Sequence, residues 1–197
     1  MTRHRHDPIT QSLHWIIALG IVAAYAIGLV REELPKGDFR AWLLTLHMSL
    51  GMLVFALSLA RIGWRSVATG PAPLPAKPAA KLAAKAVHLM LYATMLAIPV
   101  IGLFAAWAKG RTVGFFNIMP LPSPIAIDKD LAKTLESLHE VAGHAMMALA
   151  GLHAAAAIGH QYLLRDGTLG RMLPFVSAKP APKIERPYGG TQAFAGE

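Results

Sequence analysis

The chain has 197 residues, of which 54% are hydrophobic and 15% charged, with a mean hydropathy of +0.43 and a formal net charge of +8. Soluble domains are about one quarter charged, so this composition indicates a membrane protein with one bundle. The basic residues lie mostly between apolar segments, which argues against nucleic-acid binding. The absence of cysteine excludes disulfides, iron–sulfur clusters, thiolate zinc sites and covalently attached c-type haem.

Four apolar segments are each long enough to cross a hydrocarbon core, which needs about 20 helical residues. They span residues 12–30, 42–60, 87–108 and 138–164. Pro99 lies inside the third segment and is expected to kink it. The sequence therefore predicts an all-α, integral membrane four-helix bundle over residues 1–174, followed by a mobile cytoplasmic tail over 175–197.

The distribution of Lys and Arg predicts the orientation. Four crossings return the chain to its starting side, so the N-terminus, the 61–85 connection and the tail share one side. That side carries most of the 19 Lys and Arg residues, and the positive-inside rule therefore predicts that both termini are cytoplasmic. The expected location is the inner membrane of a bacterium.

The N-terminal residues also match a signal peptide, with a basic start, an apolar stretch and an Ala-x-Ala motif at 24–26. In that alternative, cleavage would leave three crossings and remove His14.

Histidines are the unusual feature of the fourth segment. His139 and His153 are 14 residues apart, about 40° short of four full helical turns, so they share a face and lie about 21 Å apart. His160 continues the same stripe, whereas His144 lies about 140° away on another face. Two histidines at this separation cannot bind one metal ion, but each can bind one of two stacked cofactors.

Haem b fits this pattern, because its iron takes neutral imidazole, needs no cysteine, and lies in a largely apolar ring. Each iron needs a second histidine at a matching depth on another helix. Depth pairs His47 with His139 near the outer surface, and His14 with His153 near the cytoplasm. His88 lies at a similar depth to His14, and depth alone does not choose between them.

Other polar residues have simpler interpretations. His144 is expected to hydrogen-bond across helices, and His4 and His6 are expected to be solvated. Glu140 could accept the second imidazole proton of His139, or be a solvated surface group. A transition-metal transporter is a rival function, but it would favour carboxylates and histidines at one depth near the midplane, where this sequence has almost no acid.

Five motifs resemble the bacterial cytochrome b561 family of four-helix, dihaem b membrane cytochromes. They are "SLHW" at 12–15, "HMSLGMLV" at 47–54, "HLMLYATMLAIPVIGL" at 88–103, "LHE" at 138–140 and "GLHAAAAIGHQYLLRDGTLGRMLP" at 151–174. Within that family the chain looks most similar to the superoxide oxidases, which transfer electrons from superoxide to ubiquinone.

The resemblance implies four axial histidines in two pairs. They are His14 with His153 at the inner haem, and His47 with His139 at the outer haem. The resemblance thus favours His14 over His88 as a ligand, and it makes His160 and His88 candidates for a quinone site.

Superoxide is an anion, and positive charge near the outer haem would concentrate it. Lys109 and Arg111, which follow the third segment, are the candidate steering residues. In the alternative function, the chain is an electron-transfer cytochrome b subunit that links a hydrogenase or another dehydrogenase to the quinone pool, and its outer loops dock a redox protein.

Overall fold

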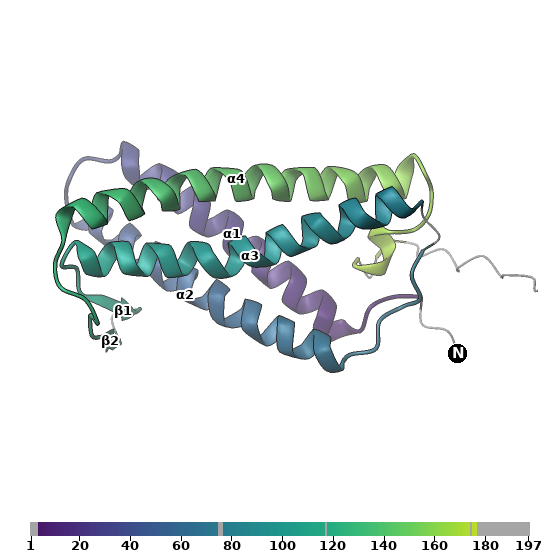
Figure 1. The fold of residues 1–197 in the computed structure, drawn as a ribbon, viewed down its shortest axis with the longest axis horizontal. Helices are drawn as coiled ribbons and strands as arrows, with labels where there is room; N and C mark the ends of the chain where they lie inside the picture. Colours follow the sequence, from purple (N-terminus) through teal and green to yellow (C-terminus); the bar gives the residue numbers. More distant parts are fainter. Residues whose placement is uncertain (1–3, 75–76, 117, 174, 177–197) are drawn as a thin grey trace, which may run out of the picture.

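The computed structural model describes residues 4–74, 77–116, 118–173 and 175–176, and four long helices run along the molecule (Figure 1). They are α1 (Pro8–Glu33), α2 (Asp38–Val67), α3 (Pro78–Ala108) and α4 (Lys129–Tyr162). All four are long and apolar enough to cross a membrane, which confirms the predicted helical bundle. Each helix begins earlier than its apolar segment, because polar residues beyond the apolar core continue the helix. We call the end with the α1–α2 turn the outer end, and the opposite end the inner end.

The start of α1 is capped by Asp7. Its carboxylate accepts hydrogen bonds from the Thr10 backbone N (2.9 Å) and hydroxyl (2.6 Å), and from the Trp64 indole at the inner end of α2 (3.0 Å). Burial alone would raise the pKa of Asp7, but the hydrogen bonds from Thr10 and Trp64 lower it to about 2. This cap therefore ties α1 to α2 most strongly in its ionised form.

Asp7→Ala is expected to destabilise the protein by about 1 kcal/mol, because it removes the N-cap acceptor. Asp7→Asn is the matched control, since asparagine caps helices as well as aspartate does. The folded pKa lies below the unfolded value of 3.8, so the carboxylate contributes stability above about pH 4 and loses it as the pH falls toward 2. Thermal unfolding in detergent at pH 7 and pH 3 measures both effects, and equal melting temperatures for wild type and Asp7→Ala at pH 7 would contradict the prediction.

The helices pack mainly as α1 on α2 and α3 on α4, with α2 and α3 joining the two pairs, and α1 and α4 have almost no backbone contact over the described residues. One buried apolar residue from each helix meets at mid-length. This middle layer consists of Ile17, Val54, Met95 and Met146. It is the centre of the hydrophobic core and separates the two ends of the bundle.

Two further layers lie seven residues, or about two helical turns, from the middle layer on every helix. The outer layer consists of Ala24, His47, Gly102 and His139, and the inner layer of Thr10, Arg61, His88 and His153. About 10 Å of helix separates successive layers. These layers therefore place four histidines at two levels, on either side of an apolar layer.

The connection between α3 and α4 contains a hairpin that the sequence did not predict. Strands β1 (Val113–Phe115) and β2 (Met119–Leu121) pair antiparallel. Val113 is buried, and the backbone N of Phe116 donates to the Ser49 hydroxyl of α2 (2.9 Å). The hairpin thus lies against the outer end of α2 (Figure 1).

The N-terminal segment packs on the 3₁₀ helix η1 (Leu169–Arg171) that follows α4, with the His6 backbone N donating to the Arg171 carbonyl (3.1 Å). The prediction that His6 is solvated is wrong. Its ring lies 3.5 Å from the position of a Cβ at Gly70, and burial, followed by the charges of Arg65 and Arg171, lowers its pKa. The predicted tail lies outside the described residues from 177 onward.

Candidate functional site

An imidazole pair faces across the outer end of the bundle. His47 of α2 and His139 of α4 have ring centroids 5.9 Å apart, with ring planes at 74°. Two imidazoles on opposite sides of one metal ion have centroids about 6 Å apart, from metal–nitrogen bonds of about 2 Å and the size of the ring. The pair predicted from depth is therefore at the separation that one iron requires.

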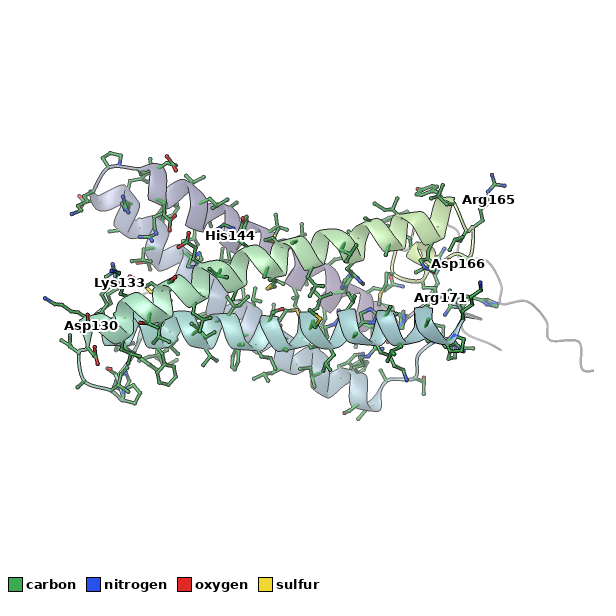
Figure 2. All side chains as sticks on the ribbon, turned by 45° about the horizontal axis from the view of Figure 1, so that its top comes forward. Asp130, Lys133, His144, Arg165, Asp166 and Arg171 are labelled. Carbon is green, nitrogen blue, oxygen red and sulfur yellow. The ribbon has the colours of Figure 1, made fainter. Side chains whose placement is uncertain are left out.

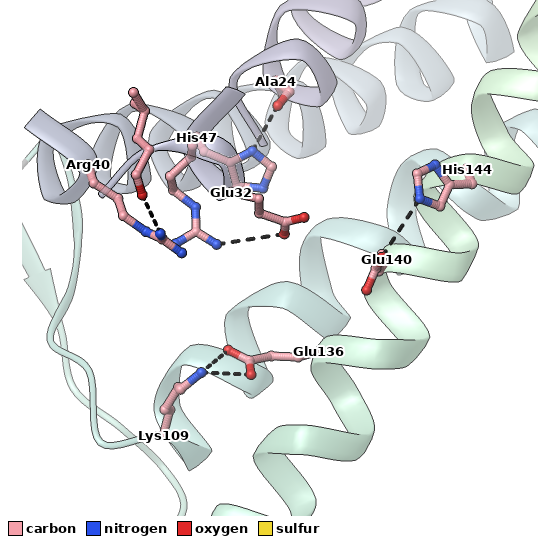
Figure 3. A network of polar contacts seen from close by, with 10 residues as sticks. Ala24, Glu32, Arg40, His47, Lys109, Glu136, Glu140 and His144 are labelled. Atoms are coloured by element: carbon pink, nitrogen blue, oxygen red, sulfur yellow. Dashed lines mark hydrogen bonds and ion pairs between the residues drawn. The ribbon is translucent and has the colours of Figure 1, made fainter. Parts of the chain in front are cut away.

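Both rings are held in the same tautomer. The His47 Nδ1 lies 2.8 Å from the Ala24 carbonyl oxygen (Figure 3), and the His139 Nδ1 lies 2.9 Å from the Ile98 carbonyl oxygen. A carbonyl only accepts, so each Nδ1 must carry the proton and each Nε2 keeps its lone pair. This is the form of imidazole that ligates haem iron, with the second nitrogen fixed by a backbone acceptor.

Glycines form the surface on which these rings lie. A Cβ at Gly102 of α3 would lie 2.8 Å from Cε1 of His139, and a Cβ at Gly28 of α1 would lie 3.4 Å from Cε1 of His47. Each glycine comes one turn after the residue whose carbonyl accepts the ring proton. Both rings are therefore seated in the same way, each on a helix that does not carry it.

Gly102→Ala is expected to displace the His139 ring. Haem binding at the outer pair should weaken by roughly 10- to 100-fold, since overpacking costs about 1–3 kcal/mol. Haem content after purification and dilution measures this loss. Gly63→Ala is the control, because nothing lies within 4 Å of its Cβ position. If Gly102→Ala retained haem as well as the wild type does, the claim that the His139 ring requires a glycine at position 102 would be contradicted.

A cavity of about 800 Å³ lies beside the outer pair. Its walls include Leu44, Met52 and Leu103, and Gly51 and Gly143 face open space within it. Cofactor pockets of about 300–1,000 Å³ with mostly apolar walls and a few convergent polar groups are usual. The cavity and its two free Nε2 atoms therefore fit a haem.

Charged side chains surround the mouth of the cavity. They are the basic Arg31, Lys36, Arg40, Lys109 and Arg111, and the acidic Glu32, Glu136 and Glu140. Lys109 donates to both carboxylate oxygens of Glu136 (2.5 and 2.7 Å; Figure 3). Arg111 is exposed and has no ion pair within the described part of the chain. Of the two predicted steering residues, Arg111 thus has the less compensated charge.

His144 lies outside the outer pair, as its helix face predicts. Its Nδ1 is 2.8 Å from the Tyr25 hydroxyl of α1, which is a hydrogen bond between the two helices that otherwise hardly touch. Its Nε2 is 3.9 Å from Glu140 (Figure 3). The alternative in which Glu140 accepts the second proton of His139 is wrong, because the Ile98 carbonyl takes that position.

Three histidines gather at the inner end. The ring centroid of His153 lies 6.3 Å from that of His14 and 5.3 Å from that of His88. The first separation is nearer the roughly 6 Å expected for two ligands of one iron. Residues 4–74, 77–116, 118–173 and 175–176 contain no group of three or more potential ligands around one point. His14 and His153 therefore form the better pair, with His88 beside it.

His160 is held at the end of α4 by Asp166, which Figure 2 labels there. The His160 Nδ1 is 2.6 Å from Asp166 Oδ2, and Asp166 also accepts from the Thr168 backbone N and hydroxyl. Burial would raise the pKa of Asp166, but the hydrogen bonds from Thr168 and His160 lower it. His160 lies seven residues beyond His153, so it is about two turns from the inner pair.

Sequence reasoning missed Gly28, Gly102 and Arg61, which the structure brings beside the histidines. The seven-residue spacing of the layers is the signal that could have found two of them. Gly102 is seven residues from Met95, as His139 is from Met146, and Arg61 follows Val54 by the same interval.

Similarity to known proteins extends over most of the chain. The family model described as "Prokaryotic cytochrome b561" matches residues 5–175. "Cytochrome b561 homolog 1" of Escherichia coli (strain K12) is 32% identical over 166 residues, covering 82% of this chain and 93% of that protein. "Cytochrome b561 homolog 2" of the same organism is 31% identical over 176 residues, covering 87% and 93%. "Probable superoxide oxidase CybB" of Yersinia pestis is 29% identical over 164 residues, covering 82% and 92%.

Proposed function

Because the chain belongs to the prokaryotic cytochrome b561 family, we propose that it is a dihaem b cytochrome that oxidises periplasmic superoxide and reduces ubiquinone at the cytoplasmic side. Membership makes it a multi-pass bacterial membrane protein of electron transport and implies haem b. In the proposed orientation, both termini are cytoplasmic and the outer end is periplasmic. The His47–His139 pair, with both Nδ1 protons held by backbone carbonyls beside a cavity, is the observation that carries the proposal.

The protein's own residues bind, orient and insulate. His47 and His139 would hold the outer haem, and their carbonyl partners keep both Nε2 atoms available. His14 and His153 would hold the inner haem. The haems, when bound, supply one-electron transfer between the two surfaces. The buried middle layer excludes water between the two sites, so that electrons but not hydrated ions pass.

At the outer surface, the basic residues of the cavity mouth would raise the local concentration of superoxide. Two superoxide anions give up one electron each and become dioxygen, and one quinone takes both electrons and two protons to become quinol. At the inner end, the His160 Nδ1 is bound to Asp166, so its Nε2 is the atom available to a quinone. His88 is the other candidate, because it lies beside the inner pair.

The test is to mix the purified protein with superoxide, with no other redox protein and no quinone present. Haem b is expected to be reduced within milliseconds, and added ubiquinone is expected to re-oxidise it. A pyridine haemochrome assay should find about two haem b per chain. Absence of haem reduction by superoxide would refute the enzyme function.

The mixed charge of the cavity mouth favours a second candidate, an electron-transfer subunit for a hydrogenase or another dehydrogenase. Glu32, Glu136 and Glu140 lie among the basic residues there, and both signs of charge suit the docking of a redox protein. Co-purification of such a partner, together with no reduction by superoxide, would support this function over the first.

A further inference from the structure

Arg61 is a buried arginine of α2 with only 9% of its surface exposed. Its Nε donates to the Tyr92 hydroxyl (3.2 Å), and its Nη1 donates to the Thr10 carbonyl (3.4 Å). No carboxylate of the described residues lies within 4.0 Å of it. The guanidinium thus has two neutral hydrogen-bond partners and no direct ion pair among the described residues.

A charge in this position is costly. Buried charges in proteins are normally paired, because burial removes the solvation that an ion has in water. Ser58 lies one turn before Arg61 on the same face of α2, is fully buried, and its hydroxyl has no hydrogen-bond partner. Two adjacent buried polar groups therefore lack the acceptor that an anionic ligand would supply.

The guanidinium lies at the inner histidines. The carbonyl that it contacts belongs to Thr10, one turn before His14, and the ring of His14 lies 6.3 Å from that of His153. In the layer pattern, Arg61 holds the place on α2 that His47 holds in the outer layer. Both side chains bond to a carbonyl of α1. α2 therefore provides a ligand to the outer site and a positive charge to the inner one.

We propose that Arg61, assisted by the Ser58 hydroxyl, binds a propionate carboxylate of the haem held by His14 and His153. The inference rests on the proposed function, because it requires a haem at the inner pair. A guanidinium forms strong charge-assisted hydrogen bonds with a carboxylate, and the two contacts described above leave its Nη2 to donate to the propionate.

The same contact has a consequence for electron transfer. Reduction of a haem iron adds one negative charge, which a nearby positive charge stabilises. Arg61 therefore raises the reduction potential of the inner haem relative to a protein without this charge. The charge favours electron flow from the outer pair toward the inner one.

Redox titration of the haem-loaded Arg61→Gln protein tests this inference. One of the two haem components is expected to move to lower potential, while the other keeps its wild-type value. Lys81→Gln is the control, since Lys81 is an exposed cation near the same end of the bundle, on α3; both of its components should stay close to wild type. Unchanged potentials in an Arg61→Gln protein that holds two haems would overturn the inference and leave the proposed function standing.

A second measurement does not depend on the folding of Arg61→Gln. Arg61→Lys keeps the charge but loses the planar fork. With haem labelled with ¹³C at the propionates, the infrared redox-difference spectrum should show a propionate band that shifts between wild type and Arg61→Lys. Identical propionate bands would overturn the inference. A wild-type chain with fewer than two haems would instead refute the dihaem proposal on which it rests.

Discussion

Replacing His47 or His139 with alanine is expected to remove one haem and leave the other in place. Haem content should fall from about two to about one per chain, because only the outer iron loses one of its two imidazole ligands. His14→Ala and His153→Ala should remove the other haem. The pyridine haemochrome assay gives the content, and redox titration shows which component has disappeared.

His144→Ala is the internal control, because His144 lies on the same helix but bonds to Tyr25 instead of facing the outer pair. It should keep both haems. His88→Ala should also keep both, since the 6.3 Å separation favours His14 as the partner of His153. Loss of a haem in His88→Ala, with full retention in His14→Ala, would reverse that assignment.

Charge changes at the cavity mouth are expected to alter the superoxide reaction in opposite directions. Arg111→Gln removes a positive charge that has no ion pair among the described residues, so the rate of haem reduction should fall by roughly 2- to 5-fold at low ionic strength. Glu136→Gln frees Lys109 from its ion pair, so the rate should rise by a similar factor.

Lys133→Gln is the matched control, because Lys133 is an exposed residue near the outer end of α4 that does not line the cavity (Figure 2). Its rate should stay near wild type. The differences should shrink above about 0.1 M salt, where the screening length is about 10 Å. Equal rates for Arg111→Gln and Glu136→Gln at low salt would contradict steering at this mouth.

Much of the fold could be predicted because it depends on local properties. Apolar length alone located the four helices, since each span needs about 20 apolar residues. The relation of His139 to His153 is internal to one rigid helix, so its periodicity predicted both the shared face and the spacing. The hairpin at 113–121 was missed, because its burial depends on Ser49 and the outer end of α2 rather than on its own short strands.

The details of the site could not be predicted in this way. Ile98 carries no chemical signal in the sequence, yet its carbonyl fixes the tautomer of His139. Glu140 is adjacent to His139 in the chain, but the helix turns it toward His144 instead. The sequence predicted Lys109 as a steering charge, but the fold pairs it with Glu136 of α4.

The sequence by itself determined that four apolar helices form the bundle and that histidines lie at two depths along them. Both follow from hydropathy and helical periodicity, which are properties of single segments. The tertiary structure decided which carbonyls hold the rings, why Gly28 and Gly102 must be small, and that Arg61 is buried beside the inner pair without a carboxylate. These features depend on how each helix is rotated and shifted against its neighbours. That rotation is set by the packing of the middle layer, where all four helices meet.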